Sequence, residues 1–219
     1  MAKTQVISAK EAAAFVKDGM TIMIGGFMTN GTAESIINEI VKTGAKDLTV
    51  ICNDAGFQGK GAGALIASGQ MKTLIASHVG LNKEVAEKSN SGELELILVP
   101  QGTLAERVRS GAAGLGGFLT PTGVGTIVEE GKQVLNVDGT DYILEKPLHA
   151  DVAIVQAYHA DETGNLCYRG STRNFNTLIA GAADIVLAEI EEIVPAGEIG
   201  VDSVETPHIF VDYLIKKED

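Results

Sequence analysis

The chain has 219 residues, of which 45% are hydrophobic and 21% are charged, a composition that fits one globular domain and excludes a disordered polypeptide. The formal net charge of −12 argues against nucleic-acid binding, which needs a basic surface to contact phosphates. No apolar run reaches the roughly 18 residues of a membrane helix, and the first residues lack the apolar core of a secretory signal. A single cytoplasmic domain spanning residues 1–219 is therefore expected.

Short apolar runs alternate with helical patterns along the chain. Buried strands are expected at residues 20–26, 47–54, 71–77, 93–100, 150–158 and 183–190. Helices are expected at residues 32–44, 82–92, 103–111 and 174–183. This β-α order predicts an α/β fold, an open and mostly parallel sheet with helices on both faces.

Capping residues mark the ends of two of these helices. Thr32 is the expected N-cap of the first helix and Gly44 its C-terminal stop. Thr103, with Glu106 three residues later, has the capping-box pattern, and Gly111 is the expected stop of that helix. Each of these helices is expected to begin shortly after a strand.

One segment interrupts the β-α order. In residues 132–145, "KQVLNVDGTDYILE", two alternating runs flank Asp138-Gly139. This dipeptide favours the tight turn of a two-residue hairpin. We expect an antiparallel β-hairpin insertion here.

The first glycine loop, "GGFMTNG" at Gly25–Gly31, follows a strand and precedes a helix. Open α/β sheets bind ligands at this position, beyond the carboxyl ends of their strands. The loop has neither the GK[ST] of a P-loop nor the pattern GxGxxG. Two interpretations stay open: a tight strand-to-helix turn, or a close approach of backbone amides to a carboxylate, phosphate or thioester.

A second glycine cluster, "GAAGLGGFLTPTGVG", spans Gly111–Gly125 with six glycines in fifteen residues. A flexible linker would be polar, whereas this segment carries Leu115, Phe118 and Val124 and is expected to pack. A long ordered loop is more often functional than not. It is interpreted as a pocket wall or, alternatively, as a structural crossover.

Polar side chains follow several of the expected strands. Gln101 comes directly after residues 93–100, and Asn53 and Asp54 end the second strand. An amide at a strand end can donate to a developing oxyanion, and a plain surface turn is the alternative. His78 also follows a strand, although a lone histidine is more often packed or solvated.

The remaining reactive residues form no recognisable set. Cys52 and Cys167 are expected to be free thiols, and the four histidines are scattered, so no metal-ligand pattern exists. Glu129 and Glu130 are interpreted as a solvated face, with paired catalytic carboxylates as the alternative. From the residues alone, the sequence predicts a glycine-walled crevice with amide donors and no nucleophile–base pair.

Four segments carry a family resemblance. They are "DGMTIMIGGFMTNGT", "LVPQGTLAERVRSGAAGLGGFLTPTGVGT", "EEGK" and "RNFN", and they resemble the alpha subunit of family I CoA-transferases, particularly those of the acetate/butyrate–acetoacetate class. The likeness runs from about Asp18 to Asp184. One position departs from it, because Ala33 stands where the family's first signature has proline. Alanine is acceptable near the first turn of a helix, so the function is not in doubt.

The resemblance implies the CoA-transferase (NagB/RpiA-like) fold and a role for particular residues. Gln101 would donate to the oxyanion, and Asn53 would help to hold the substrate carboxylate. The CoA-contacting element would comprise Gly25, Gly26, Phe27, Met28, Thr29, Asn30 and Gly31. The acyl pocket would be lined by Gly114, Gly116, Gly117 and Phe118.

The resemblance also implies what this chain lacks. In such enzymes the nucleophilic glutamate belongs to a separate beta subunit, which forms a glutamyl-CoA thioester in ping-pong catalysis. The expected assembly is α2β2 or α4β4, acting on acyl-CoA and acids such as acetate, butyrate and acetoacetate. No permanently bound cofactor or metal is expected, and coenzyme A enters as a thioester substrate.

Two other functions stay open. A related phosphosugar isomerase would be active alone and would need a basic residue beside the phosphate, for which Arg173 is the candidate. A non-catalytic acyl-CoA-binding domain would bind ligand without turnover, even with a partner present.

Overall fold

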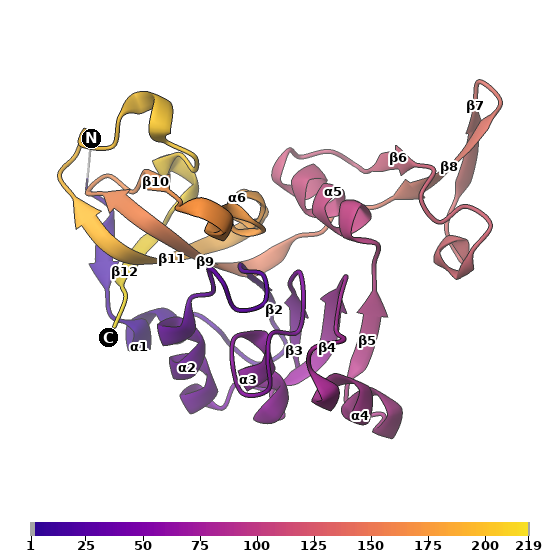
Figure 1. The fold of residues 1–219 in the computed structure, drawn as a ribbon, viewed down its shortest axis with the longest axis horizontal. Coiled ribbons are helices and arrows are strands. Elements are labelled where there is room, and N and C mark those ends of the chain that lie inside the picture. Colours follow the sequence, from indigo (N-terminus) through magenta and orange to yellow (C-terminus); the bar gives the residue numbers. More distant parts are fainter. Residues whose placement is uncertain (1–2, 219) are drawn as a thin grey trace.

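The main sheet forms the centre of the computed structural model, which describes residues 3–218. Its strands are β1 (Gln5–Ile7), β2 (Thr21–Ile24), β3 (Leu48–Ile51), β4 (Met71–Ala76), β5 (Glu95–Leu98), β9 (Ala150–Asp161), β10 (Leu166–Cys167), β11 (Ala183–Val194) and β12 (Tyr213–Lys216). Their order is β1-β12-β11-β9-β2-β3-β4-β5, with β10 beside β9 (Figure 1). All neighbours are parallel except β10 and β9. The chain runs outward from β2 to β5 and then crosses to β9, so the strand order reverses between β2 and β9.

Helices cover both faces of this sheet. They are α1 (Ala9–Ala13), α2 (Glu34–Thr43), α3 (Ala62–Ala67), α4 (Lys83–Ser91), α5 (Gln101–Ala112) and α6 (Asn176–Ile179), with short 3-10 turns η1 (Ile127–Glu129), η2 (Gly170–Arg173), η3 (Val201–Ser203) and η4 (His208–Phe210). One hydrophobic core packs α1 to α4 against the sheet, and a second packs α5 and α6 against the opposite face (Figure 1). The predicted α/β fold is confirmed. No helix within the described residues is both long and apolar enough to cross a membrane.

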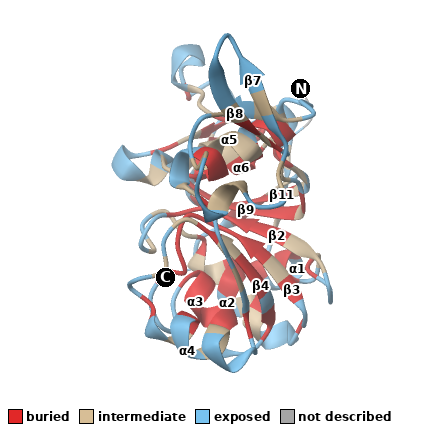
Figure 2. Ribbon diagram, turned by 90° about the vertical axis from the view of Figure 1, so that its right-hand side faces the viewer, coloured by how far each residue is buried: buried red, intermediate tan, exposed pale blue. Residues whose placement is uncertain are grey.

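The sequence of strand β2 is continuously apolar because both of its faces are buried. Ile22 and Ile24 point into the first core, and Met23 points into the second. Side chains alternate between the two faces of a strand, so a strand covered on both faces needs an apolar residue at every position. Figure 2 shows buried residues along β2 and its neighbours β9 and β11.

The predicted hairpin belongs to a small arm that projects from the body (Figure 1). The arm contains β6 (Phe118–Thr120), β7 (Val134–Val137) and β8 (Thr140–Glu145), in the antiparallel order β6-β8-β7. Asp138 and Gly139 have φ of 50° and 82°, as a type I′ turn requires. Buried Glu145 lies 2.6 Å from Lys132 Nζ in the arm and 3.8 Å from Arg107 Nε on α5. The pair with Arg107 joins the arm to α5, and the pair with Lys132 lies within the arm.

The predicted N-cap of α2 is wrong by one residue. Thr32 is not its N-cap, because Ala33 occupies that position and the Thr32 hydroxyl donates to the carbonyl of Gly25 at 3.2 Å. Gly44 is confirmed as the left-handed residue that ends the helix, with φ of 71°. The loop before α2 therefore uses the threonine to close itself.

The predicted capping box of α5 is also wrong. The helix begins at Gln101 with Pro100 at the N-cap, so Thr103 lies inside it. Gly111 is likewise inside the last turn, and Ala113 is the C-cap. The N-cap lies three residues earlier than predicted, directly after β5, and this places Gln101 at the first position of the helix.

A buried carboxylate caps α2 from another element. Glu189 on β11 is fully buried, and its Oε2 accepts from the backbone N–H groups of Ser35 at 2.9 Å and Ile36 at 3.3 Å. Its Oε1 has no hydrogen-bond partner among the described residues. Burial raises the pKa of Glu189 above its ordinary value.

This raised pKa predicts a pH-dependent stability. The folded chain binds the Glu189 proton more tightly than the unfolded chain, so its stabilising effect is complete below the ordinary pKa of about 4.5 and is lost as the pH rises through the folded value. Glu189→Gln removes this titration, so the Tm of the variant minus that of the wild type should increase with pH above 4.5. Exposed Glu198→Gln is the matched control, and parallel Tm curves for wild type and Glu189→Gln would contradict the prediction.

Candidate functional site

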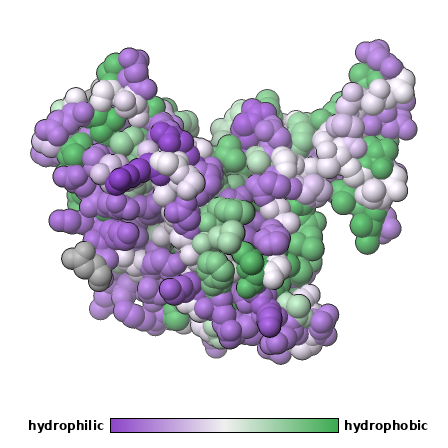
Figure 3. Space-filling view, in the orientation of Figure 1, coloured by the Kyte–Doolittle hydropathy of each residue, from purple (hydrophilic) through white to green (hydrophobic). Residues whose placement is uncertain are grey.

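An open cleft of about 570 Å³ lies beyond the carboxyl ends of β2, β3 and β4. It is lined by Phe27, Asn53, Ser77, His78, Gln101, Asn174, Phe175 and Leu178. It sits beside the junction of β2 and β9, where the strand order reverses and open α/β sheets bind ligands. Figure 3 shows hydrophobic residues gathered at the centre of this side of the molecule.

Two predicted amide side chains meet in the cleft. Gln101 Nε2 donates to Asn53 Oδ1 at 2.7 Å, and Asn53 Nδ2 donates to the carbonyl oxygen of Gly26 at 2.8 Å. Asn53 is buried, whereas Gln101 is exposed at the edge of the cleft. A glutamine amide has two N–H groups, so one remains to donate to a bound ligand. This is the arrangement that an oxyanion donor needs.

Ser77 belongs to the same cluster and was not singled out from the sequence. It follows β4, between the ends of β3 and β5, and its hydroxyl contacts the Gln101 side chain. A sequence signal for it exists: Asn53, Ser77 and Gln101 are spaced by 24 residues each, one for each successive β-α unit. Residues at equal positions in neighbouring units reach the same edge of a parallel sheet.

The first glycine loop is glycine-rich because of its own packing. A Cβ at Gly25 would lie 1.7 Å from Asn176 Oδ1, and one at Gly26 would lie 2.0 Å from Thr32 Oγ1. Gly26 and Gly31 also have φ of 113° and 77°, which side-chain-bearing residues rarely adopt. The interpretation as a tight strand-to-helix turn is supported, and these glycines are required without any ligand.

The tip of this loop presents side chains rather than bare backbone. Phe27 and Asn30 form an antiparallel bridge, with N–H···O distances of 3.1 and 2.9 Å. Between them, Met28 and Thr29 adopt left-handed conformations with φ of 50° and 64°. Phe27 and Met28 are 48% and 39% exposed. A ligand approaching the loop would meet these two apolar side chains.

A second loop after β3 has the same form. In "GFQGKG", Gly56–Gly61, Phe57 and Lys60 form an antiparallel bridge as Phe27 and Asn30 do. No internal repeat was predicted from the sequence, although both loops begin with Gly-Phe and end with Gly. Only the structure shows that they pack as a pair.

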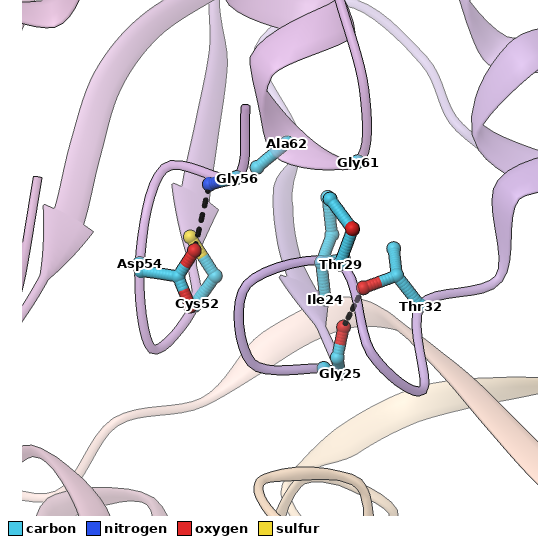
Figure 4. Close-up of a pocket in the computed structure, with 10 residues that line it drawn as sticks. Ile24, Gly25, Thr29, Thr32, Cys52, Asp54, Gly56, Gly61 and Ala62 are labelled. Atoms are coloured by element: carbon cyan, nitrogen blue, oxygen red, sulfur yellow. Dashed lines mark hydrogen bonds between the residues drawn. The ribbon is translucent and has the colours of Figure 1, made fainter. Parts of the chain in front are cut away.

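Asp54 joins the two loops. Its carboxylate accepts from the Met28 N–H at 2.9 Å and from the Gly56 N–H at 2.8 Å. Figure 4 shows Asp54 beside Gly56 on one side of a small pocket, with Thr29 and Thr32 on the other. The pocket has a volume of about 10 Å³, room for about one water molecule and too small for an acyl group. The larger cleft is therefore the candidate ligand site.

The segment predicted to line the acyl pocket does not line this cleft, and its role stays a prediction. Gly114, Gly116, Gly117 and Phe118 follow the far end of α5, whose 12 residues extend about 18 Å from Gln101. A Cβ at Gly117 would lie 2.4 Å from the carbonyl oxygen of Glu145, so the contact with β8 requires this glycine. These four residues form the base of the arm and are not among the described residues that line the cleft.

Several charged candidates have other partners. Arg173 pairs with Glu205 and donates to the carbonyl oxygen of Gly170 at 3.3 Å, so its guanidinium is already engaged. Glu106 pairs with Arg109 on the surface of α5. Glu129 accepts from the Gly125 N–H at 2.7 Å within the arm. These three side chains do not line the cleft.

The cleft offers hydrogen-bond donors without a strong nucleophile. None of its lining residues, all within the described part of the chain, is a carboxylate or a thiol. Cys52 is buried beneath the loops, and burial raises the pKa of its thiol far above the ordinary value. Residues 3–218 contain no group of three or more His, Cys, Asp or Glu side chains placed to hold a metal ion.

Comparison with known proteins agrees with this geometry. A model of the family "Coenzyme A transferase" matches residues 6–217. The chain is 50% identical over 217 residues to the alpha subunit of the acetate CoA-transferase of Escherichia coli (strain K12), covering 99% of both chains. It is 44% identical over 214 residues to the alpha subunit of the acetoacetyl-CoA:acetate/butyrate CoA transferase of Clostridium acetobutylicum, covering 98% of both.

A solved structure shows the same fold in a longer chain. An acyl-CoA transferase of E. coli O157:H7, in a thioester complex with CoA, superimposes with a TM-score of 0.86 at 20% identity. The match covers 98% of this chain and 47% of that one, so this chain spans about half the length of that transferase. The resemblance found in the sequence is thus confirmed over almost the whole length, and the chain belongs to the coenzyme A transferase family.

Proposed function

We propose that this chain is the alpha subunit of a short-chain acyl-CoA:carboxylate CoA-transferase. Its substrates are acyl-CoA thioesters and acids of the acetate, butyrate and acetoacetate class, as the names of its relatives indicate. The observation that carries the proposal is the Asn53–Gln101 amide pair in a cleft without a carboxylate or thiol among its described lining residues. A coenzyme A transferase needs a nucleophilic carboxylate, and we propose that a partner subunit brings it to this site.

In the proposed reaction, the nucleophile is a glutamate of a beta subunit. Its carboxylate attacks the thioester carbonyl, and CoA thiolate leaves to give an acyl-glutamyl anhydride. The thiolate then attacks the glutamyl carbonyl, which forms the glutamyl-CoA thioester and releases the first acid. The acceptor acid reverses these steps. Each attack passes through a tetrahedral oxyanion, and the free Gln101 N–H would donate to it.

Asn53 has a different role in this proposal from the one expected. The sequence resemblance implied that Asn53 helps to hold the substrate carboxylate. Its side chain, however, is buried and already bonded to Gly26 and Gln101. These bonds support an orienting role toward Gln101. The exposed Phe27 and Met28 support a CoA-facing or partner-facing role for the loop tip.

The proposed partner covers the open side of the cleft. An acyl-enzyme anhydride hydrolyses unless water is excluded, and the cleft of this chain alone is open. We propose a hetero-oligomer, α2β2 or α4β4, in which the beta subunit closes the site. Coenzyme A is a substrate there and not a bound cofactor, and a cytoplasmic location stays a prediction.

A non-catalytic acyl-CoA-binding domain is the second candidate, because this chain's cleft has donors without a nucleophile. The phosphosugar isomerase is disfavoured, because Arg173 is paired with Glu205. A transferase and a binding domain differ in whether a covalent thioester forms on a partner.

Intact mass spectrometry distinguishes the two. The chain is incubated together with its cognate beta subunit and acetyl-CoA, in the absence of an acceptor acid. A CoA thioester adduct is expected only on the beta subunit, because only that chain supplies the nucleophile. An adduct on this chain would overturn the division of roles, and the absence of any adduct would favour the binding domain. A beta subunit with its nucleophilic glutamate replaced by alanine is the control.

A further inference from the structure

Ser77 is the one side chain in the amide cluster without a function so far. It lies directly after β4, between Asn53 and Gln101. Its hydroxyl oxygen lies within hydrogen-bond distance of Gln101 Oε1 and 2.9 Å from the backbone carbonyl oxygen of Asn53. A hydroxyl has a single proton, so it can donate to only one of these acceptors at a time.

The carbonyl oxygen of Gly26 determines how the amide groups of Asn53 and Gln101 are oriented. The carbonyl of Gly26 can only accept, so Asn53 must turn its amide nitrogen toward it. Asn53 Oδ1 then faces Gln101, which must present its own nitrogen at 2.7 Å. Consequently Gln101 Oε1 points the other way, toward Ser77. Each amide orientation follows from the one before it, starting at a backbone carbonyl.

The hydroxyl proton of Ser77 has two possible acceptors, the carbonyl oxygen of Asn53 and Oε1 of Gln101. The carbonyl oxygen of Asn53 already accepts from the backbone N–H groups of Ser77 at 3.0 Å and His78 at 3.3 Å. These two bonds occupy both of its lone pairs. The hydroxyl proton of Ser77 is therefore left for Gln101 Oε1.

We propose that Ser77 is a positioning residue that fixes the Gln101 side chain with its free N–H toward the reacting carbonyl. The proposal rests on the donor role of Gln101 under the proposed function. Gln101 is exposed, so without fixed partners its side chain would sample other rotamers. Ser77 holds the oxygen end of the amide, and Asn53 holds the nitrogen end.

Ser77→Ala in the assembled αβ enzyme tests this role. It should lower kcat about tenfold, the size expected when one hydrogen bond is lost, with KM for the acyl-CoA changed less than about twofold. Ser77→Thr keeps a hydroxyl and should restore kcat to within about threefold of the wild type. A merely structural role would change Tm and would not give this separation of kcat from KM.

Ser68 provides a matched control. Its hydroxyl donates to Gln70 Oε1 at 2.6 Å, at the end of α3 and outside the cleft. Ser68→Ala removes the same kind of serine–glutamine bond and should leave kcat unchanged. An equal loss of kcat in Ser68→Ala and Ser77→Ala would overturn the proposal.

A double-mutant cycle tests the positioning role of Ser77 separately from the donor role of Gln101. If Ser77 acts through Gln101, Ser77→Ala should have no further effect on kcat in the Gln101→Ala background. The same tenfold loss in both backgrounds, or a wild-type kcat for Ser77→Ala, would overturn the Ser77 proposal alone. A wild-type kcat for Gln101→Ala would overturn the donor role itself, and Ser77 with it.

Discussion

Gln101→Ala is expected to lower kcat of the assembled transferase by about 100-fold or more, the usual effect of removing one oxyanion donor. The side chain stands at the first position of α5, with one N–H bonded to Asn53 and the other without a partner among residues 3–218. Because this donor matters most when charge develops on the carbonyl oxygen, KM for the acyl-CoA should change little. Steady-state kinetics of the αβ enzyme, with acetoacetyl-CoA and acetate, measures both constants.

Gln101→Glu makes the test sharper. The carboxylate has the shape of the amide but cannot donate, and it would face Asn53 Oδ1, now 2.7 Å from the Gln101 nitrogen. Its kcat should be at least as low as that of Gln101→Ala. Gln133→Ala, an exposed glutamine on the arm, is the control and should have wild-type kinetics. A kcat for Gln101→Glu close to the wild-type value would show that this side chain is not the donor.

Six strands of the main sheet, β2, β3, β4, β5, β9 and β11, were predicted from the sequence, whereas β1, β10 and β12 were missed. Ile22, Met23 and Ile24 are apolar in succession because both faces of β2 are covered, and such a run is visible in the sequence. The Asp138-Gly139 turn was predictable for a different reason: its left-handed backbone conformation restricts the residues that fit there. Local restrictions of this kind leave a local pattern.

The start of α4 was predicted correctly, with Asn82 as its N-cap, but the start of α2 was not, because a tertiary contact replaces the expected cap. Glu189 on β11 satisfies the first N–H groups of α2, more than 150 residues away along the chain. Thr32, which has the right residue type for a cap, instead closes the glycine loop. The helix α3 was missed too, because Gly61 precedes it with no side-chain cap.

The candidate site was predictable residue by residue and not as a cluster. Asn53 and Gln101 were each found at a strand end, but their 2.7 Å contact depends on the register of β3, β4 and β5. The same register brings Ser77 between them. The role of the acyl-pocket segment stays a prediction: Gly117 is required by the contact of the arm with Glu145, and sequence alone cannot distinguish a glycine needed by the fold from one needed by a ligand.

Gly25→Ala is expected to destabilise the chain by about 3 kcal/mol or more, within the range of severe core substitutions. The new Cβ would lie 1.7 Å from Asn176 Oδ1, and Asn176 is fully buried. Asn176 accepts from the Gln156 N–H at 3.0 Å and donates to the carbonyl of Gly31 at 2.8 Å. Moving it would leave buried polar groups unpaired, which costs about 1–3 kcal/mol for each group. Denaturant unfolding of the wild type and the variant measures the difference.

Gly116→Ala is the matched control, because nothing lies within 4 Å of a Cβ there and its backbone is not left-handed. The cause can be isolated with Asn176→Ala, which removes the atoms that the new methyl group would strike. If the collision is the whole effect, Gly25→Ala should cost much less in the Asn176→Ala background than in the wild type. Equal costs in both backgrounds would mean that Gly25 is required for another reason. Since the collision is internal, it must appear in the isolated chain without coenzyme A or a beta subunit, which separates the glycine's structural role from any contact with ligand.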